Sequence, residues 1–165
     1  TTGVAGCATS RIAFSANTSG SNKEVFIADY DGANLVQVTK HNNTSIKPKL
    51  SPDGSRIAYV SFKDMGQFLY ILDIRTGESR VLSKKVGMNA APSWAPDGNS
   101  LAIVLSRDGN PEIYIASADG ADLRRVTVNK AVDTSPAFHP SAQSLAFVSE
   151  RMGRPQIFSM NLNGE

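Results

Sequence analysis

The sequence predicts an all-β protein built from β-propeller blades, each a four-stranded antiparallel meander. Three observations lead to this prediction: a repeat of about 44 residues, turn motifs in phase with the repeat, and the lack of any helical periodicity. One apolar position recurs at Ile12, Ile57, Leu101 and Leu145, with spacings of 45, 44 and 44 residues. Four-stranded repeats near this length are typical of propeller blades rather than of helical solenoids.

A full repeat consists of an inner strand A, which begins at a proline, followed by strands B, C and D. Strand B is expected at residues 11–15, 56–60, 100–104 and 144–148, and strand C at 25–28, 68–71, 112–115 and 156–159. Strand D follows in three repeats, at 35–39, 79–83 and 123–127. Turns separate the strands because proline fixes φ and glycine accepts the left-handed conformation. These turns are Ser51-Pro52-Asp53-Gly54, Ala95-Pro96-Asp97-Gly98 and a degraded His139-Pro140-Ser141-Ala142 before strand B, and Asp31-Gly32, Thr76-Gly77, Asp119-Gly120 and Asn163-Gly164 after strand C.

The side chains of strand B indicate how the blades stack. Bulky residues point to one face of the sheet, while an alanine at the same place in every repeat points to the other. A blade is covered on both faces by its neighbours, and a small residue on one face admits the large residues of the next blade. The bulky residues include Ile12, Phe14, Ile57 and Tyr59, and the alanines are Ala13, Ala58, Ala102 and Ala146.

The strand order is B-C-D, A-B-C-D, A-B-C-D and A-B-C, so the first blade lacks strand A and the last lacks strand D. We therefore assign residues 1–165 to a partial propeller. Its blades are expected at about 8–39, 47–83, 91–127 and, incomplete, 135–165. Since such a chain cannot close a ring, we interpret it as a fragment, and its exposed blade faces predict self-association.

Composition and motifs argue against several classes of function. The 17 basic and 15 acidic residues are interleaved along the sequence, without the basic stripe of a nucleic-acid binder. The longest apolar run, Leu101 to Leu105, is too short to span a bilayer. There is no cysteine pair, phosphate-binding glycine loop or nucleophile elbow, and His41 and His139 lack partners at useful spacing. The sequence therefore predicts no enzyme activity, no cofactor and no metal site.

Three local features have structural interpretations. The segment from Asp29 to Asn34 is similar to the start of a calcium loop, but Lys40 stands where its glutamate should be, so a hairpin turn is favoured. Trp94 occupies the place of Leu50 and Phe138 in the other repeats, which predicts a core position. The third feature is a pair of arginines, Arg124 and Arg125, which are expected to form a solvated outer edge.

The third repeat carries a resemblance to a known family. The segment Pro92-Ser93-Trp94-Ala95-Pro96-Asp97-Gly98, with the strands that follow it, resembles the blades of the TolB family. Further similarities are Thr2-Gly3 ahead of the first strand, Asp29-Tyr30-Asp31-Gly32, and Gly153-Arg154-Pro155-Gln156-Ile157. Similar blades occur in the propellers of some serine peptidases, so a non-catalytic peptidase propeller is the alternative. A sugar-binding propeller would have aromatic residues in its channel-mouth loops, and these loops contain none.

The resemblance implies a periplasmic protein of the Tol–Pal system, with a six-bladed propeller that follows a small α/β domain. It also implies a function without chemistry: binding of the lipoprotein Pal, and of other Tol proteins, at the channel mouth, in support of envelope integrity and cell division. The matching positions precede the proline of each strand A, and Met88 stands where a histidine is expected. The positions are Thr44, Ser45, Ile46, Lys47, Met88, Asn89, Ala90, Ala91, Asp133, Thr134 and Ser135.

Overall fold

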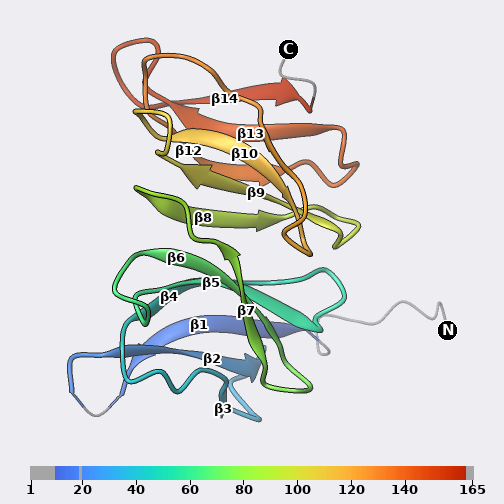
Figure 1. Cartoon of the computed structure of the whole chain (residues 1–165). Coiled ribbons are helices and arrows are strands. Elements are labelled where there is room, and N and C mark those ends of the chain that lie inside the picture. Colours follow the sequence, from blue (N-terminus) through green and yellow to red (C-terminus); the bar gives the residue numbers. More distant parts are fainter. Residues whose placement is uncertain (1–9, 19, 163–165) are drawn as a thin grey trace, which may run out of the picture.

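Four antiparallel sheets follow one another along the chain and stack face to face, from the N-terminal to the C-terminal end (Figure 1). The computed structural model describes residues 10–18 and 20–162. Within that part every regular element is a strand, and no helix occurs. The all-β prediction and the predicted order of strands are confirmed. Thr2-Gly3 and the turn expected at Asn163-Gly164 lie outside the described residues.

The strands of each blade are joined in simple meander order. Blade 1 contains β1 (Arg11–Asn17), β2 (Lys23–Asp29) and β3 (Val36–Gln37). Blade 2 contains β4 (Ser45–Leu50), β5 (Arg56–Ser61), β6 (Phe68–Asp73) and β7 (Ser79–Ser83). Blade 3 contains β8 (Asn89–Trp94), β9 (Ser100–Leu105), β10 (Glu112–Ser117) and β11 (Leu123–Arg125). Blade 4 contains β12 (Asp133–Phe138), β13 (Ser144–Ser149) and β14 (Gln156–Asn161). The inner strands β4, β8 and β12 contact one another in turn.

The outer strands of blades 1 and 3 end earlier than predicted, before Thr39 and Thr127. At each threonine, the side-chain hydroxyl takes the place of a backbone carbonyl as the acceptor for an amide of the neighbouring strand. The Val25 amide donates to Thr39 Oγ1 at 2.8 Å, and the Ile113 amide donates to Thr127 Oγ1 at the same distance. Because the hydroxyl gives this amide a hydrogen-bond partner, the strand pairing can end here without leaving a buried amide unpaired.

Each inner strand begins three residues before its proline, earlier than the sequence suggested, and contains a β-bulge. The pairing with strand B shifts at the same place in all three blades. There the residue before the proline has a left-handed φ, which is uncommon outside glycine. These residues are Lys47 at 53°, Ala91 at 50° and Ser135 at 52°. Because bulges redirect side chains, the repeated bulge shapes the concave inner side of the arc.

The predicted interlocking of small and large faces is observed at all three blade junctions. The alanine face of one blade packs against the bulky face of the next, and the bulky partners are almost fully buried. The pairs are Ala13 with Ile57 and Tyr59, Ala58 with Leu101 and Ile103, and Ala102 with Leu145 and Phe147. A flat sandwich with one polar face is therefore excluded.

The two end faces of the arc have no neighbouring blade in this structure. Ile12 and Phe14 of β1 are exposed on the bulky face of blade 1, and Ile157 of β14 is exposed at the other end. These are apolar surfaces of the kind that blades normally cover. Self-association through them stays a prediction.

Arginines tie each blade to the next one. Arg56, the first residue of β5, donates from Nη2 to the Gly98 carbonyl at 2.8 Å, and its guanidinium lies 4.9 Å from the Trp94 ring centroid. Arg11 makes the equivalent hydrogen bond to the turn of blade 2. Trp94 is buried, as predicted, and its Nε1 donates to the Lys49 carbonyl at 2.9 Å.

The solvated outer edge that the sequence suggested is observed at Arg124 but not at Arg125. Arg124 is exposed, and its Nη2 donates to the Leu162 carbonyl of blade 4 at 2.8 Å. Arg125 is half-buried: its Nη2 lies 2.9 Å from Oε1 of Glu112, whose side chain is fully buried, and its Nη1 lies 3.6 Å from Asp108 Oδ2. For Arg125 the prediction was wrong, because a buried carboxylate lies within reach of this short strand.

His41 lies where the chain crosses from blade 1 to blade 2. Its Nε2 is 2.9 Å from Tyr59 Oη, and the two rings stack with their centroids 6.0 Å apart. Burial lowers the pKa of His41 below its usual value, and the nearby positive charge of Lys63 lowers it further. The histidine therefore serves as a neutral structural contact.

The arginine contact between blades 2 and 3 gives a first testable prediction. Arg56→Ala removes a hydrogen bond from a charged donor and a cation–π contact, so it should lower the free energy of unfolding by about 1–2 kcal/mol. Urea denaturation measures the change. Arg75→Ala, at an exposed position in the same blade, should change it by less than about 0.5 kcal/mol. Equal effects of the two substitutions would contradict the assigned role.

His41 predicts how stability depends on pH. Because its pKa is lower in the folded chain, the unfolded chain binds the proton first, and stability falls as the pH drops below about 6.5. His41→Gln should flatten the dependence of the unfolding free energy on pH between about 7.5 and 5.5. The matched control, His139→Gln in an exposed turn, should keep the wild-type slope. An unchanged slope in His41→Gln would rule out this contribution.

Candidate functional site

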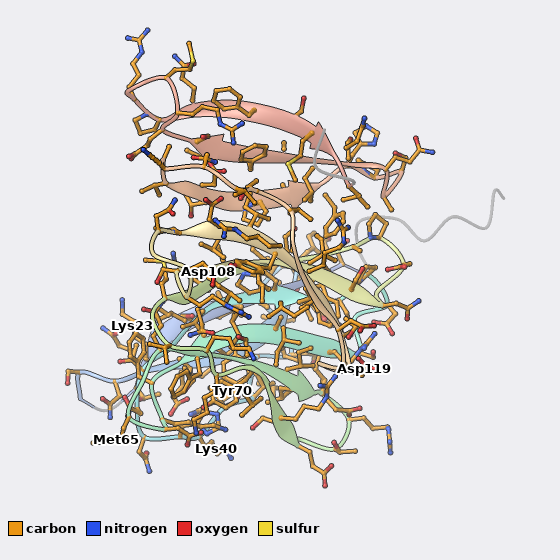
Figure 2. All side chains as sticks on the ribbon, turned by 45° about the horizontal axis from the view of Figure 1, so that its top comes forward. Lys23, Lys40, Met65, Tyr70, Asp108 and Asp119 are labelled. Carbon is orange, nitrogen blue, oxygen red and sulfur yellow. The ribbon has the colours of Figure 1, made fainter. Side chains whose placement is uncertain are left out.

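The strand ends divide the arc into two faces. Ser45 pairs with Ser61 and Leu69 with Ser83, so the D-to-A connections and the B-to-C connections emerge at the same edge of the sheets. We call this edge the mouth face; it comprises residues 38–44, 84–88 and 126–132, together with 62–67, 106–111 and 150–155. The opposite edge, the turn face, comprises residues 51–55, 95–99 and 139–143, together with 30–35, 74–78 and 118–122. Figure 2 shows Lys40 and Met65 on the mouth face and Asp119 on the opposite side of the arc.

A hollow of about 410 Å³ lies against the inner strands of three blades. It is lined by the residues around the three bulges, so equivalent positions of blades 2, 3 and 4 converge there. The lining residues are Lys47, Pro48, Lys49, Ala91, Pro92, Ser135, Pro136 and Ala137. Another hollow, of about 430 Å³, is lined by residues of blade 2 alone. The repeated geometry makes the first hollow the stronger candidate site.

The predicted site residues separate into accessible and buried groups. The sequence suggested that all of them lie in connecting loops, but most belong to the first half of an inner strand. Accessible positions can touch a partner directly, whereas buried ones can act only by holding the backbone in place. The accessible residues are Thr44, Ile46, Lys47, Met88, Ala91, Thr134 and Ser135, and the buried ones are Ser45, Asn89, Ala90 and Asp133.

The buried members at the strand starts make hydrogen bonds inside the protein. Asn89 accepts from Ser83 Oγ at 2.7 Å and donates to the Lys85 carbonyl at 2.8 Å, which fixes the connection at 84–88. Asp133 Oδ2 accepts from Arg151 Nη2 at 3.0 Å. These residues therefore support the shape of the mouth face.

Two buried glutamates, Glu24 and Glu112, hold connections of the mouth face in place, and the sequence analysis did not identify them. Glu24 Oε1 accepts from the amides of His41 and Asn42 at 2.7 and 2.8 Å. Glu112 Oε1 accepts from the Asn129 amide at 2.9 Å. Each carboxylate binds the backbone of a D-to-A connection and faces no open cavity. The available sequence signal was a glutamate at the same position in two repeats, because a buried carboxylate requires hydrogen-bond donors around it.

Tyrosines hold two of the B-to-C connections in place. Tyr70 Oη donates to Asp64 Oδ2 at 2.7 Å, and Tyr114 Oη donates to Asp108 Oδ2 in the next blade. The tyrosine hydrogen bond lowers the pKa of each aspartate. Burial, and next the bond to Asp108, raises the pKa of Tyr114 to about 12, so this hydroxyl remains a donor at neutral pH.

Large apolar side chains stand exposed on the mouth face, and the sequence analysis identified only Met88 among them. Their exposed fractions range from 41% at Met88 to 101% at Met65, with Val86, Val128 and Met152 between these values. The sequence signal was a bulky residue next to glycine at a connection, as in Met65-Gly66 and Met152-Gly153. Exposed methionine and valine on these connections suit contact with another protein.

Within residues 10–18 and 20–162, no group of three or more His, Cys, Asp or Glu side chains is arranged to hold a metal ion. The described part also has no helix with the length and apolarity needed to cross a membrane. The segment 29–34 forms the expected hairpin turn: the Ala33 amide donates to Asp31 Oδ1 at 3.0 Å, and Gly32 has a φ of 87°. The site as built offers shape, charge and apolar contacts.

Comparisons with known proteins place this geometry in a family. The family model described as "TolB beta propeller domain" matches residues 1–165. A Tol-Pal system protein TolB from Desulfotalea psychrophila is 41% identical over 91 residues, which cover 54% of this chain and 20% of the relative. The crystal structure of TolB from Acinetobacter baumannii superposes with a TM-score of 0.88 at 34% identity, over 99% of this chain and 42% of that one.

The chain thus spans about two fifths of the length of the Acinetobacter protein. The tricorn protease also superposes, with a TM-score of 0.65 over 86% of this chain and 14% of that one, but at 17% identity this likeness shows the fold alone. The whole-length family match and the close superposition agree with the repeated all-β fold described above. The chain belongs to the TolB β-propeller family.

Proposed function

We propose that this chain is a non-enzymatic protein-interaction module of the Tol–Pal system, working in the periplasm and binding Pal through the mouth face. Its role would be to support envelope integrity and cell division. The observation that carries the proposal is the convergence of three equivalent bulges on one hollow, beside exposed apolar connections. Relatives that are named Tol-Pal system protein TolB supply the identity of the system.

The chemistry of the mouth face supports recognition rather than catalysis. Two of its buried carboxylates, Glu24 and Glu112, accept hydrogen bonds from threonine hydroxyls and backbone amides. The third, Asp133, accepts from Arg151 and Asn129 through Oδ2, while its Oδ1 has no partner among the described residues. The phenols of Tyr70 and Tyr114 are engaged with Asp64 and Asp108. Rigid, satisfied connections of this kind present a preformed surface, which lowers the entropic cost of binding a partner.

The alternative, a non-catalytic propeller of a serine peptidase, would use the same surface to restrict access to a hydrolase domain. No contact in the described residues favours it over the first proposal. The two differ in their partner: one predicts a stable complex with Pal, and the other predicts a covalently linked hydrolase domain.

Titration calorimetry of the chain with purified Pal tests the proposal. Ala91→Gln places a long neutral side chain at the hollow, and Thr134→Gln does so beside it, so each should weaken binding about tenfold or more, equivalent to about 1.4 kcal/mol. Ala121→Gln, exposed on the turn face, is the matched control and should change the affinity less than twofold.

Thermal denaturation of the three variants establishes that each is folded. If the folded wild-type chain fails to bind Pal, the partner assignment is wrong. If Ala121→Gln weakens binding as much as Ala91→Gln does, the mouth face is not the binding surface.

A further inference from the structure

The two faces of the arc carry opposite charge, although the net charge is only +2. The D-to-A connections at 38–44, 84–88 and 126–132 contain lysines and no acidic residue. These lysines are Lys40, Lys84, Lys85 and Lys130, all of them exposed. In Figure 2, Lys23 and Lys40 lie together on this side of the arc.

The turn face is acidic. Its turns carry the acidic residues Asp31, Asp53, Glu78, Asp97, Asp119 and Asp122 and one basic residue, Arg75, and aspartate side chains cap several of these tight turns. Arg11, Arg56 and Arg80 donate to carbonyls of the same turns, which offsets part of this negative charge. Asp53 accepts from Ser51 and Ser55, and these hydrogen bonds lower its pKa, so it remains ionised at neutral pH. The separation of charge follows the repeat, since aspartates cap turns on this edge of blades 1, 2 and 3, whereas the D-to-A connections on the other edge contain no acidic residue.

Most acidic residues on the mouth face are already neutralised by neighbours. Asp64 lies 3.5 Å from Lys84 Nζ, and Asp108 lies 3.4 Å from Arg107 Nε. Glu150 is the remaining exposed carboxylate in its described connections. The mouth face thus keeps a surplus of positive charge.

The surplus extends into the hollow itself. Lys47 and Lys49 are exposed and line it, and the residues that complete the lining are proline, alanine and serine. None of the ion pairs among the described residues includes either lysine. Two uncompensated ammonium groups in a concave site raise the local concentration of anionic groups and favour a carboxylate there.

We infer that the mouth face and the adjoining hollow on the inner strands bind an acidic protein segment that carries large apolar side chains, with its carboxylates at Lys47 and Lys49 of β4. This inference rests on the proposed function and names the chemistry of the partner surface. The apolar side chains of the segment would contact the exposed connections, which include Val86, Met88 and Val128. A protein segment fits better than a membrane or a nucleic acid because the two lysines lie inside a hollow of about 410 Å³ instead of on a continuous basic surface.

Fluorescence anisotropy with the full chain tests this inference. The probe is a labelled peptide of glutamate, leucine and serine, and its counterpart has lysine in place of glutamate. Pal is measured in parallel, each at about 50 and 300 mM NaCl, because screening weakens exposed charge contacts. The acidic peptide and Pal should bind, the lysine peptide should not, and the higher salt should weaken binding several-fold.

Matched charge reversals locate the effect. Lys47→Glu in the hollow should weaken binding of the acidic peptide and of Pal on the order of tenfold, mostly through slower association. Lys85→Glu should act in the same direction, and Arg75→Glu on the turn face, with the same change in charge, should alter affinity less than twofold. All three sites are exposed, so thermal stability should be retained.

The outcomes separate the two proposals. If Pal binds independently of salt and of Lys47→Glu, the acidic-segment inference fails while the proposed function stands. If the acidic peptide binds in the predicted way and Pal does not, the Pal assignment fails and the inference stands. Tighter binding to phosphatidylglycerol vesicles or duplex DNA than to the peptide would overturn the choice of a protein segment.

Discussion

The packing of the alanine face of one blade against the bulky face of the next is the constraint on which this structure depends. Each sheet is apolar on both sides, so no blade can bury its core alone. Ala58 and Ala102 leave room for Leu101, Ile103 and Leu145 of the following blades. A larger residue at such an alanine would force strain into a close-packed interior. This interlocking fixes the relative position of the inner strands, and so brings three bulges to one hollow.

Hydrogen bonds to buried carboxylates connect that core to the mouth face. Glu24 and Glu112 accept hydrogen bonds from backbone amides of the D-to-A connections and so hold these connections in place. In blade 2, Phe68 occupies the equivalent place and cannot accept such hydrogen bonds. There the side-chain amide of Asn89, at the start of β8, holds the connection at 84–88. Either a carboxylate or an amide can therefore hold a connection. This indicates that the fixed conformation of these connections matters more than the identity of the side chain that holds them. A rigid surface of this kind can select a partner by shape and charge.

The sequence predicted the strand order, the turns and the packing of the blades, because each depends on a local pattern repeated at fixed spacing. It did not predict the bulges at Lys47, Ala91 and Ser135, since the left-handed φ values occur at residues without any conformational preference for them. The site positions were found by alignment on the prolines, but their burial depends on tertiary contacts such as that between Asp133 and Arg151. The sequence also did not predict the separation of charge between the two faces. Basic and acidic residues are interleaved along the chain, and only the meander of strands places them at opposite edges of the sheets.

The central claim is that the mouth face is the protein-binding surface. Hydrogen–deuterium exchange of the chain, alone and with Pal, tests it most directly, because slower exchange marks the amides that a partner covers. The account predicts slower exchange at 62–67, 84–88 and 106–111, with the turns at 51–55, 95–99 and 118–122 unchanged. Slower exchange confined to those turns, with the mouth face unaffected, would contradict it.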